Sequence, residues 1–104
     1  MPLIARGYGA DTVTTGEGCQ PETVTMSGSR TVFIAGSVCH RMGDLNQPHT
    51  WNPGALCPIH VTPITVASET VFADGLGVAR LGDTYLMFEE ITTVTQSSVF
   101  ADGA

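Results

Sequence analysis

The fold is decided by residues 31–44, which read TVFIAGSVCHRMGD, because the same pattern returns at residues 70–83 as TVFADGLGVARLGD. The two copies are 39 positions apart and share Thr, Val, Phe, Gly, Arg, Gly and Asp at equal offsets. Each copy places a glycine between two short runs rich in β-branched and aromatic residues, which is typical of a tight hairpin turn. The repeat therefore predicts one β-hairpin in each copy.

A third, incomplete copy stands at the end of the chain. Residues 98–104 read SVFADGA and stop at the turn, so this strand lacks its returning partner, an arrangement that proteins usually avoid. Residues 3–7, LIARG, resemble residues 77–81 and supply the missing half. We therefore expect a single domain over residues 1–104, with three hairpins in pseudo-threefold symmetry and the third hairpin closed by the N- and C-terminal strands.

The composition points to the same fold class. Charged residues make up only 13% of the 104 residues, about half the usual share, which leaves too few to solvate the outer faces of helices. The 12 glycines, 6 prolines and many threonines and valines favour strands and turns, so we expect an all-β protein.

Charge and hydropathy limit the possible partners. The formal charge of −6, with no lysine, argues against a nucleic-acid partner and against acidic membrane surfaces. The sequence contains no long apolar stretch, so we expect neither a signal peptide nor a spanning helix, and a soluble protein made in the cytoplasm.

Each complete repeat closes with Arg-x-Gly-Asp, formed by Arg41 with Asp44 and by Arg80 with Asp83. The glycine permits a sharp exit from the strand, and the aspartate can bind local backbone amides or the arginine. We interpret these four charged residues as structural rather than catalytic.

Two other groups of residues are interpreted as packing residues. Cys39 and His40 are adjacent, so in a strand they face opposite sides and cannot both bind one ion, and we read them as packing or rim residues. Residues 85–88, YLMF, are predicted to be a strand that enters the third hairpin and gives hydrophobic cover. One helical turn is the alternative.

Residues that could bind a metal collect between the hairpins. They are Glu17, Cys19, His49, Cys57 and His60. In a reducing compartment, three cysteines mixed with histidines suggest a metal before a disulfide. Two cysteines and two histidines would suffice for tetrahedral zinc, and a small domain often needs such a clamp. The alternative is that these are scattered polar loop residues.

The pattern Val-Phe-x-x-Gly-x-x-x-x-Arg-x-Gly-Asp resembles the PAAR-repeat family, whose Pro-Ala-Ala-Arg occupies the positions of residues 38–41 and 77–80. The similarity covers almost the whole chain, including Cys57-Pro58-x-His60. It implies a cone of β-hairpins whose broad base sits on the blunt end of a trimeric β-helical spike. It also implies an apex that holds zinc through histidine and cysteine.

The resemblance carries over a ligand set only in part. His49 and His60 match family ligand positions, whereas Glu17 stands where the family commonly has histidine, and the usual cysteine soon after the second Gly-Asp is absent. Cys19 and Cys57 would have to supply the other two bonds, with Glu17 in reserve. Two thiolates and two imidazoles suit zinc better than iron.

The resemblance implies a non-enzymatic tip, one per spike trimer, in a phage tail, a type VI secretion system or a related contractile particle. Such a tip sharpens the spike that pierces the target envelope and contacts the target membrane transiently. Two alternatives are a small zinc hydrolase, with Glu17 or Glu89 as its base, and a zinc-ribbon adaptor that binds nucleic acid.

Overall fold

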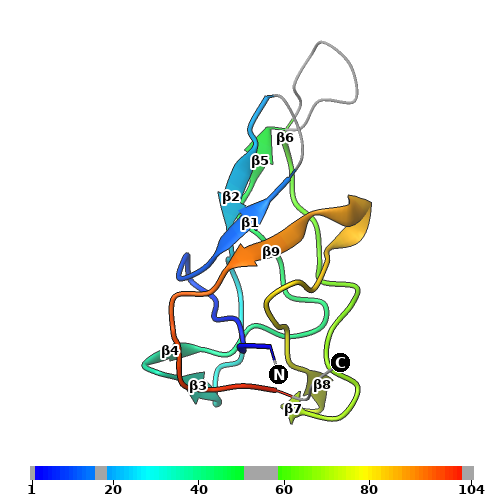
Figure 1. Ribbon diagram of the computed structural model, residues 1–104. Helices are drawn as coiled ribbons and strands as arrows, with labels where there is room; N and C mark the ends of the chain where they lie inside the picture. The colour runs from blue at the N-terminus through cyan, green and yellow to red at the C-terminus, as the bar shows by residue number, and fades with distance from the viewer. Residues whose placement is uncertain (1, 16–18, 51–58, 102–104) are drawn as a thin grey trace.

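The computed structural model describes residues 2–15, 19–50 and 59–101 (Figure 1). In this part of the chain the strands are two to four residues long and every strand pairing is antiparallel. The strands are β1 (Thr12–Thr14), β2 (Glu22–Val24), β3 (Phe33–Ile34), β4 (Ser37–Val38), β5 (His49–Thr50), β6 (Ile59–His60), β7 (Phe72–Ala73), β8 (Leu76–Gly77) and β9 (Glu90–Thr93). The predicted all-β class is confirmed. The described residues include no helix that is long and apolar enough to cross a membrane.

Both complete sequence repeats form the predicted β-hairpins. Strand β3 pairs with β4, and β7 pairs with β8. The turn residues Ala35 and Gly36 have φ values of 48° and 89°, and Asp74 and Gly75 have values of 54° and 80°. Two successive left-handed residues are the pattern of a type I′ turn, whose twist matches that of the strands it joins.

Three segments meet through a closed ring of backbone hydrogen bonds. The amide of Ala5 donates to the carbonyl of Ala79 at 2.9 Å, and the amide of Ala79 donates to the carbonyl of His40 at 2.8 Å. The amide of His40 completes the ring by donating to the carbonyl of Ala5 at 3.1 Å. The ring therefore ties the N-terminal segment to both repeats, whose hairpins lie at the same end of the molecule (Figure 1).

The N-terminal segment also lies beside the end of the described chain. Leu3 and Phe100 form an isolated antiparallel bridge, and the amide of Ile4 donates to the carbonyl of Val99 at 3.0 Å. The first and last described segments of the chain lie at the end of the molecule that carries β7 and β8 (Figure 1). Residues from the two ends of the sequence are thus paired at the same end of the molecule as the two hairpins.

The Arg-x-Gly-Asp segments have the predicted local structural role. In the first copy the Oδ2 atom of Asp44 accepts hydrogen bonds from the backbone N and the Nε of Arg41, at 2.8 and 2.9 Å. The second copy repeats this geometry, with Asp83 accepting from Arg80 at 2.7 and 2.9 Å. Each aspartate therefore fixes the turn that ends its repeat.

The apolar core consists of two clusters of small and medium-sized side chains. One cluster lies near the sheet of order β2-β1-β9, and its members are Ala5, Val13, Ile64, Ala67, Ala79, Tyr85 and Ile91. The other packs under the hairpins, and its members are Ile4, Cys39, Ala73, Val78 and Ala101. The predicted packing role of Cys39 is confirmed.

Residues 85–88 do not form the predicted strand. They contain a short 3₁₀ turn, η1 (Leu86–Phe88), in which Met87 and Phe88 have positive φ. Tyr85 forms an isolated antiparallel bridge with Ile64, but the chain reverses directly after it, and the amide of Tyr85 donates to the carbonyl of Glu89 at 2.7 Å. The expected hydrophobic cover is also wrong for Phe88, which is 91% exposed.

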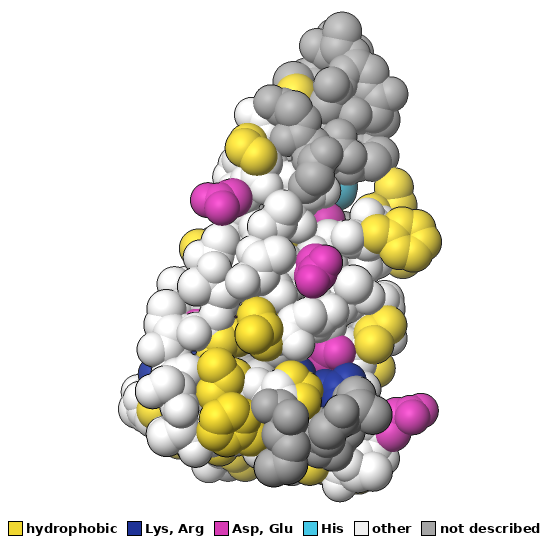
Figure 2. All heavy atoms as spheres, viewed as in Figure 1, with side chains coloured by type: hydrophobic (Ala, Val, Ile, Leu, Met, Phe, Trp, Pro, Cys, Tyr) yellow, Lys and Arg dark blue, Asp and Glu magenta, His cyan; other side chains and the backbone are white. Residues whose placement is uncertain are grey.

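Large hydrophobic side chains remain exposed on the hairpins and at Phe100, which forms an isolated bridge with Leu3. Phe33, Phe72 and Phe100, which occupy the same position in the three sequence copies, are 59%, 58% and 46% exposed. Figure 2 shows a group of hydrophobic side chains on the lower half of the molecule, toward the end that carries β3, β4, β7 and β8 in Figure 1. The molecule is elongated, at 40 × 25 × 23 Å.

Candidate metal centre

The structure brings together two of the four predicted ligands. His49 lies on β5 and His60 on β6, and the two residues are directly opposite each other in the antiparallel register. Opposed residues in such a pair point to the same face of the sheet. Their Nε2 atoms are 2.8 Å apart, and their ring centroids are 4.4 Å apart in an edge-on arrangement.

The other predicted ligands are not gathered with them in the described structure. Cys19 is disulfide-bonded, so it would have to be reduced before its sulfur could bind a metal. Its neighbour Gln20 accepts a hydrogen bond from the backbone N of Thr50 at 3.0 Å, which places this segment beside β5. Glu17 and Cys57 lie outside the described residues. The Cys₂His₂ set therefore stays a prediction.

A third metal-capable group, Glu89, reaches the two histidines from the turn before β9. Its Oε2 atom lies 2.6 Å from the Nε2 of His49 and 3.0 Å from the Nε2 of His60. One ligand atom from each residue falls within 4.8 Å of the others. We did not predict Glu89 as a ligand. It follows the second Gly-Asp by a few residues, and the family resemblance implies a cysteine ligand in that part of the sequence, which this chain lacks.

Polar partners outside the cluster orient His49 and Glu89. The Nδ1 of His49 lies 2.8 Å from the carbonyl oxygen of Gln47. The second oxygen of Glu89, Oε1, accepts hydrogen bonds from the hydroxyl of Thr62 at 2.5 Å and from the amide of Asn46 at 3.1 Å. The backbone N of Thr62 in turn donates to Oδ1 of Asn46 at 3.0 Å. Such outer partners are typical of ligands held for a metal.

The electrostatics of Glu89 favour its ionised form. Burial alone would raise the pKa of this fully buried carboxyl, but hydrogen bonds from Thr62, His60 and His49 hold the pKa below its usual value. Its ion-pair partners are the two histidines, of which His49 is buried and His60 is partly exposed. A buried carboxylate next to two imidazoles can accept a divalent cation.

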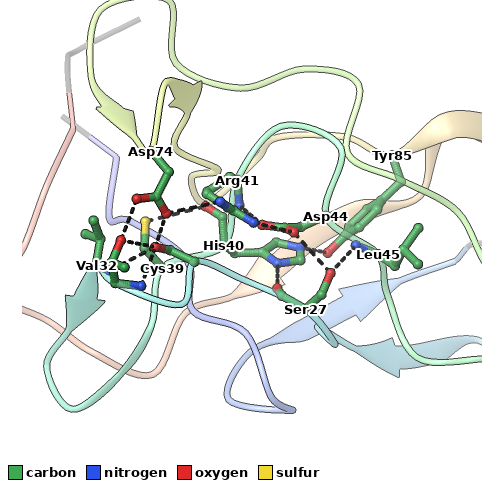
Figure 3. A network of polar contacts seen from close by, with 11 residues as sticks. Ser27, Val32, Cys39, His40, Arg41, Asp44, Leu45, Asp74 and Tyr85 are labelled. Atoms are coloured by element: carbon green, nitrogen blue, oxygen red, sulfur yellow. Dashed lines mark hydrogen bonds and ion pairs between the residues drawn. The ribbon is translucent and has the colours of Figure 1, made fainter.

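His40 lies apart from this cluster and has a structural role. Its Nδ1 is 2.6 Å from the carbonyl of Ser27, and its Nε2 is 2.7 Å from the hydroxyl of Tyr85 (Figure 3). Because a carbonyl only accepts, Nδ1 carries the proton and Nε2 accepts from Tyr85. Burial lowers the pKa of His40 and raises that of Cys39 to about 11. His40 is thus a packing residue, as predicted, and is not at a rim.

No protein family matches the chain in a comparison with known families, and no similar curated protein is found. The likeness to the PAAR-repeat family therefore rests on the repeated residues and their spacing.

Proposed function

We propose that the chain is a non-enzymatic tip that caps the trimeric central spike of a contractile injection machine, such as a phage tail or a type VI secretion system. In this role it is made in the cytoplasm, is assembled at the tip of the apparatus and is carried to the envelope of the target cell. Its contact with the target membrane is transient, and it binds no nucleic acid. The observation that carries the proposal is the threefold recurrence of an exposed phenylalanine at one end of the molecule.

Pseudo-threefold symmetry is the first part of the proposal. The ring formed by Ala5, His40 and Ala79 takes one equivalent residue from each of three units, and each donates to the next. The bridge between Leu3 and Phe100 supports a third hairpin closed by both ends of the chain. A monomer with three equivalent faces can match a trimer, because each face meets one subunit.

The second part concerns the surface that meets the spike. Phe33, Phe72 and Phe100 are each about half exposed, and each belongs to a different unit. Burial of a phenylalanine side chain contributes about 1.5–3 kcal/mol, so burial of the exposed half of all three would contribute roughly 3 kcal/mol. A broad end bearing three such side chains suits an apolar, threefold-symmetric partner surface and forms the base of the proposed cone.

The third part is a metal ion, for which zinc is the first choice and iron the second. His49 and His60 would hold the ion together with further ligands, as the family resemblance implies. When bound, the ion would crosslink β5 and β6 to their surroundings. A narrow end that cannot contain an apolar core of normal size would be stiffened in this way.

The test is binding to purified spike trimers from phage tails and type VI systems. We expect one chain per three spike subunits, measured by mass photometry. The triple variant Phe33→Ser, Phe72→Ser and Phe100→Ser should lower the affinity about 100-fold, given roughly 3 kcal/mol of lost burial. Phe88→Ser is the matched control, because Phe88 is more exposed than these three but lies in η1. Equal loss in the control, or another stoichiometry, would refute the proposal.

The runner-up is a small zinc hydrolase, favoured by the histidine and carboxylate groups that converge at Glu89. Against it, the metal-capable cluster found among the described residues holds no second carboxylate to act as a base. Metal-dependent ester hydrolysis that Glu89→Gln abolishes would revive the enzyme.

A further inference from the structure

We infer that Glu89, and not a cysteine, is the third ligand beside His49 and His60, so that the ion is held by two imidazoles and one carboxylate without a thiolate. This inference rests on the proposed metal centre but not on the proposed spike partner. It departs from the histidine and cysteine set that the family resemblance implies. The ligand chemistry is that of a first-row divalent transition ion such as Zn²⁺, Co²⁺ or Fe²⁺.

The first argument is the direction of the lone pairs. Nδ1 of His49 faces the carbonyl of Gln47 and must carry the ring proton, so its Nε2 presents a lone pair in the neutral ring. That atom lies 2.6 Å from the carboxylate oxygen of Glu89 and 2.8 Å from Nε2 of His60. A hydrogen carried by Nε2 of His60 can hold these three atoms together in the metal-free protein, and a divalent cation in its place would bind all three at once.

The second argument is that the two oxygens of the Glu89 carboxylate have different partners. Oε1 of Glu89 is occupied by donors from Thr62 and Asn46, which leaves Oε2 to face the histidines. Thr62 and Asn46 also bind each other through two hydrogen bonds, at 2.7 and 3.0 Å. All three residues are buried, so the orientation of Oε2 is fixed before an ion binds.

The third argument is the fit of an ion. Zinc bonds to nitrogen and carboxylate oxygen are about 2.0–2.2 Å long, and two ligands of a tetrahedral ion then lie about 3.3 Å apart. The separations of 2.6, 2.8 and 3.0 Å among the three atoms would have to widen by about 0.3–0.7 Å to reach this value. His60 is partly exposed, which gives an ion a route to the cluster.

The test is titration of the whole, metal-free protein with Co²⁺ under reducing conditions. We expect visible d–d absorption with no thiolate-to-cobalt charge-transfer band, and displacement of the spectrum by Zn²⁺. This measurement on the unmodified chain needs no variant to fold. A charge-transfer band that Cys19→Ser or Cys57→Ser removes would overturn the inference, as would the absence of any bound metal.

Variants then test the individual residues, with folding checked by circular dichroism. Glu89→Gln should weaken Co²⁺ binding more than 10-fold, whereas Glu90→Gln, the neighbouring exposed carboxylate, should leave it unchanged. Thr62→Val should weaken Co²⁺ binding by about 10-fold. Thr62→Ser, which keeps the hydroxyl, should bind Co²⁺ as tightly as the wild type. Equal affinities in Glu89→Gln and Glu90→Gln would overturn the assignment, and the spike-binding test would be unaffected by that result.

Discussion

Acid should destabilise the protein through His40, one of the three residues that form the ring of backbone hydrogen bonds. Its imidazole is buried and both ring nitrogens have partners, so a proton can be added only by charging a buried ring and changing its bond to Tyr85. Burial lowers the pKa of His40 and outweighs the nearby Asp44 and Asp11, which raise it, while Arg41 lowers it. The unfolded chain therefore binds a proton at a higher pH than the folded chain does.

The sign and size of the effect follow from linkage. The folded pKa of His40 lies below its ordinary value of 6.5, so the stability present above that pH is lost as the pH falls toward the folded pKa. One differential proton changes the free energy of unfolding by 1.36 kcal/mol per pH unit at most. The stability of the folded protein should therefore fall as the pH drops below about 6.5, for as long as the folded imidazole stays neutral.

The assay is urea unfolding at several pH values in the presence of a chelator, so that metal binding does not contribute to the slope. His40→Asn keeps a side-chain amide that can donate to the carbonyl of Ser27 and cannot titrate. This variant should be less stable than the wild type at neutral pH, because the hydroxyl of Tyr85 loses its acceptor. Its stability should nevertheless fall less steeply in acid. Parallel slopes in the two proteins would refute the role of His40.

Four further perturbations have expected outcomes that urea or thermal unfolding can check. Saturation with Zn²⁺ at about 100 times its dissociation constant should stabilise the folded protein by about 2.7 kcal/mol, and a chelator should reverse the rise in Tm; an unchanged Tm would contradict a structural ion. Gly77→Ala should cost about 2–3 kcal/mol because its Cβ would lie 2.2 Å from the carbonyl oxygen of Ser68. Gly36 has a φ of +89° but open space around an added Cβ, so Gly36→Ala should cost only about 1–2 kcal/mol. A larger loss of stability in Gly36→Ala than in Gly77→Ala would contradict the close packing at Gly77. Asp83→Asn should cost about 3 kcal/mol by weakening a buried pair with Arg80, and a neutral result would show that the pair is not needed.

The hairpins could be predicted from sequence because their information is local. The turns need left-handed backbone at two successive residues, and the glycine at the second position reveals them in both copies. The repeated spacing then aligns the strands without knowledge of the rest of the chain. His49 and His60 could be paired for a related reason, since they are the only histidines between the two repeats.

Glu89 could not be predicted as a ligand by the same means. It lies 40 positions from His49 and 29 from His60, and it follows a hydrophobic run that reads as a strand. The run forms a reversal instead, with two left-handed residues, Met87 and Phe88, that have no glycine to reveal them. The turn is closed by a hydrogen bond between the backbones of Tyr85 and Glu89, and it is held to the distant Pro63 through the amide of Leu86. The contact with Pro63 leaves no local sequence signal.

The two ends of the molecule are stabilised by different interactions. Near the hairpins, alanine, valine and isoleucine side chains pack around a ring of backbone hydrogen bonds. Toward β5 and β6, the buried groups are His49, Asn46, Thr62 and Glu89, whose polar atoms must all be satisfied. Four of the hydrogen bonds that meet this need converge on Glu89, whose carboxylate is the centre of the network. A buried carboxylate in the place of an apolar core stabilises a protein only when its charge is compensated, and a divalent ion beside Glu89 would supply that compensation. A bound divalent ion would also crosslink β5 and β6 to the turn before β9 through His49, His60 and Glu89.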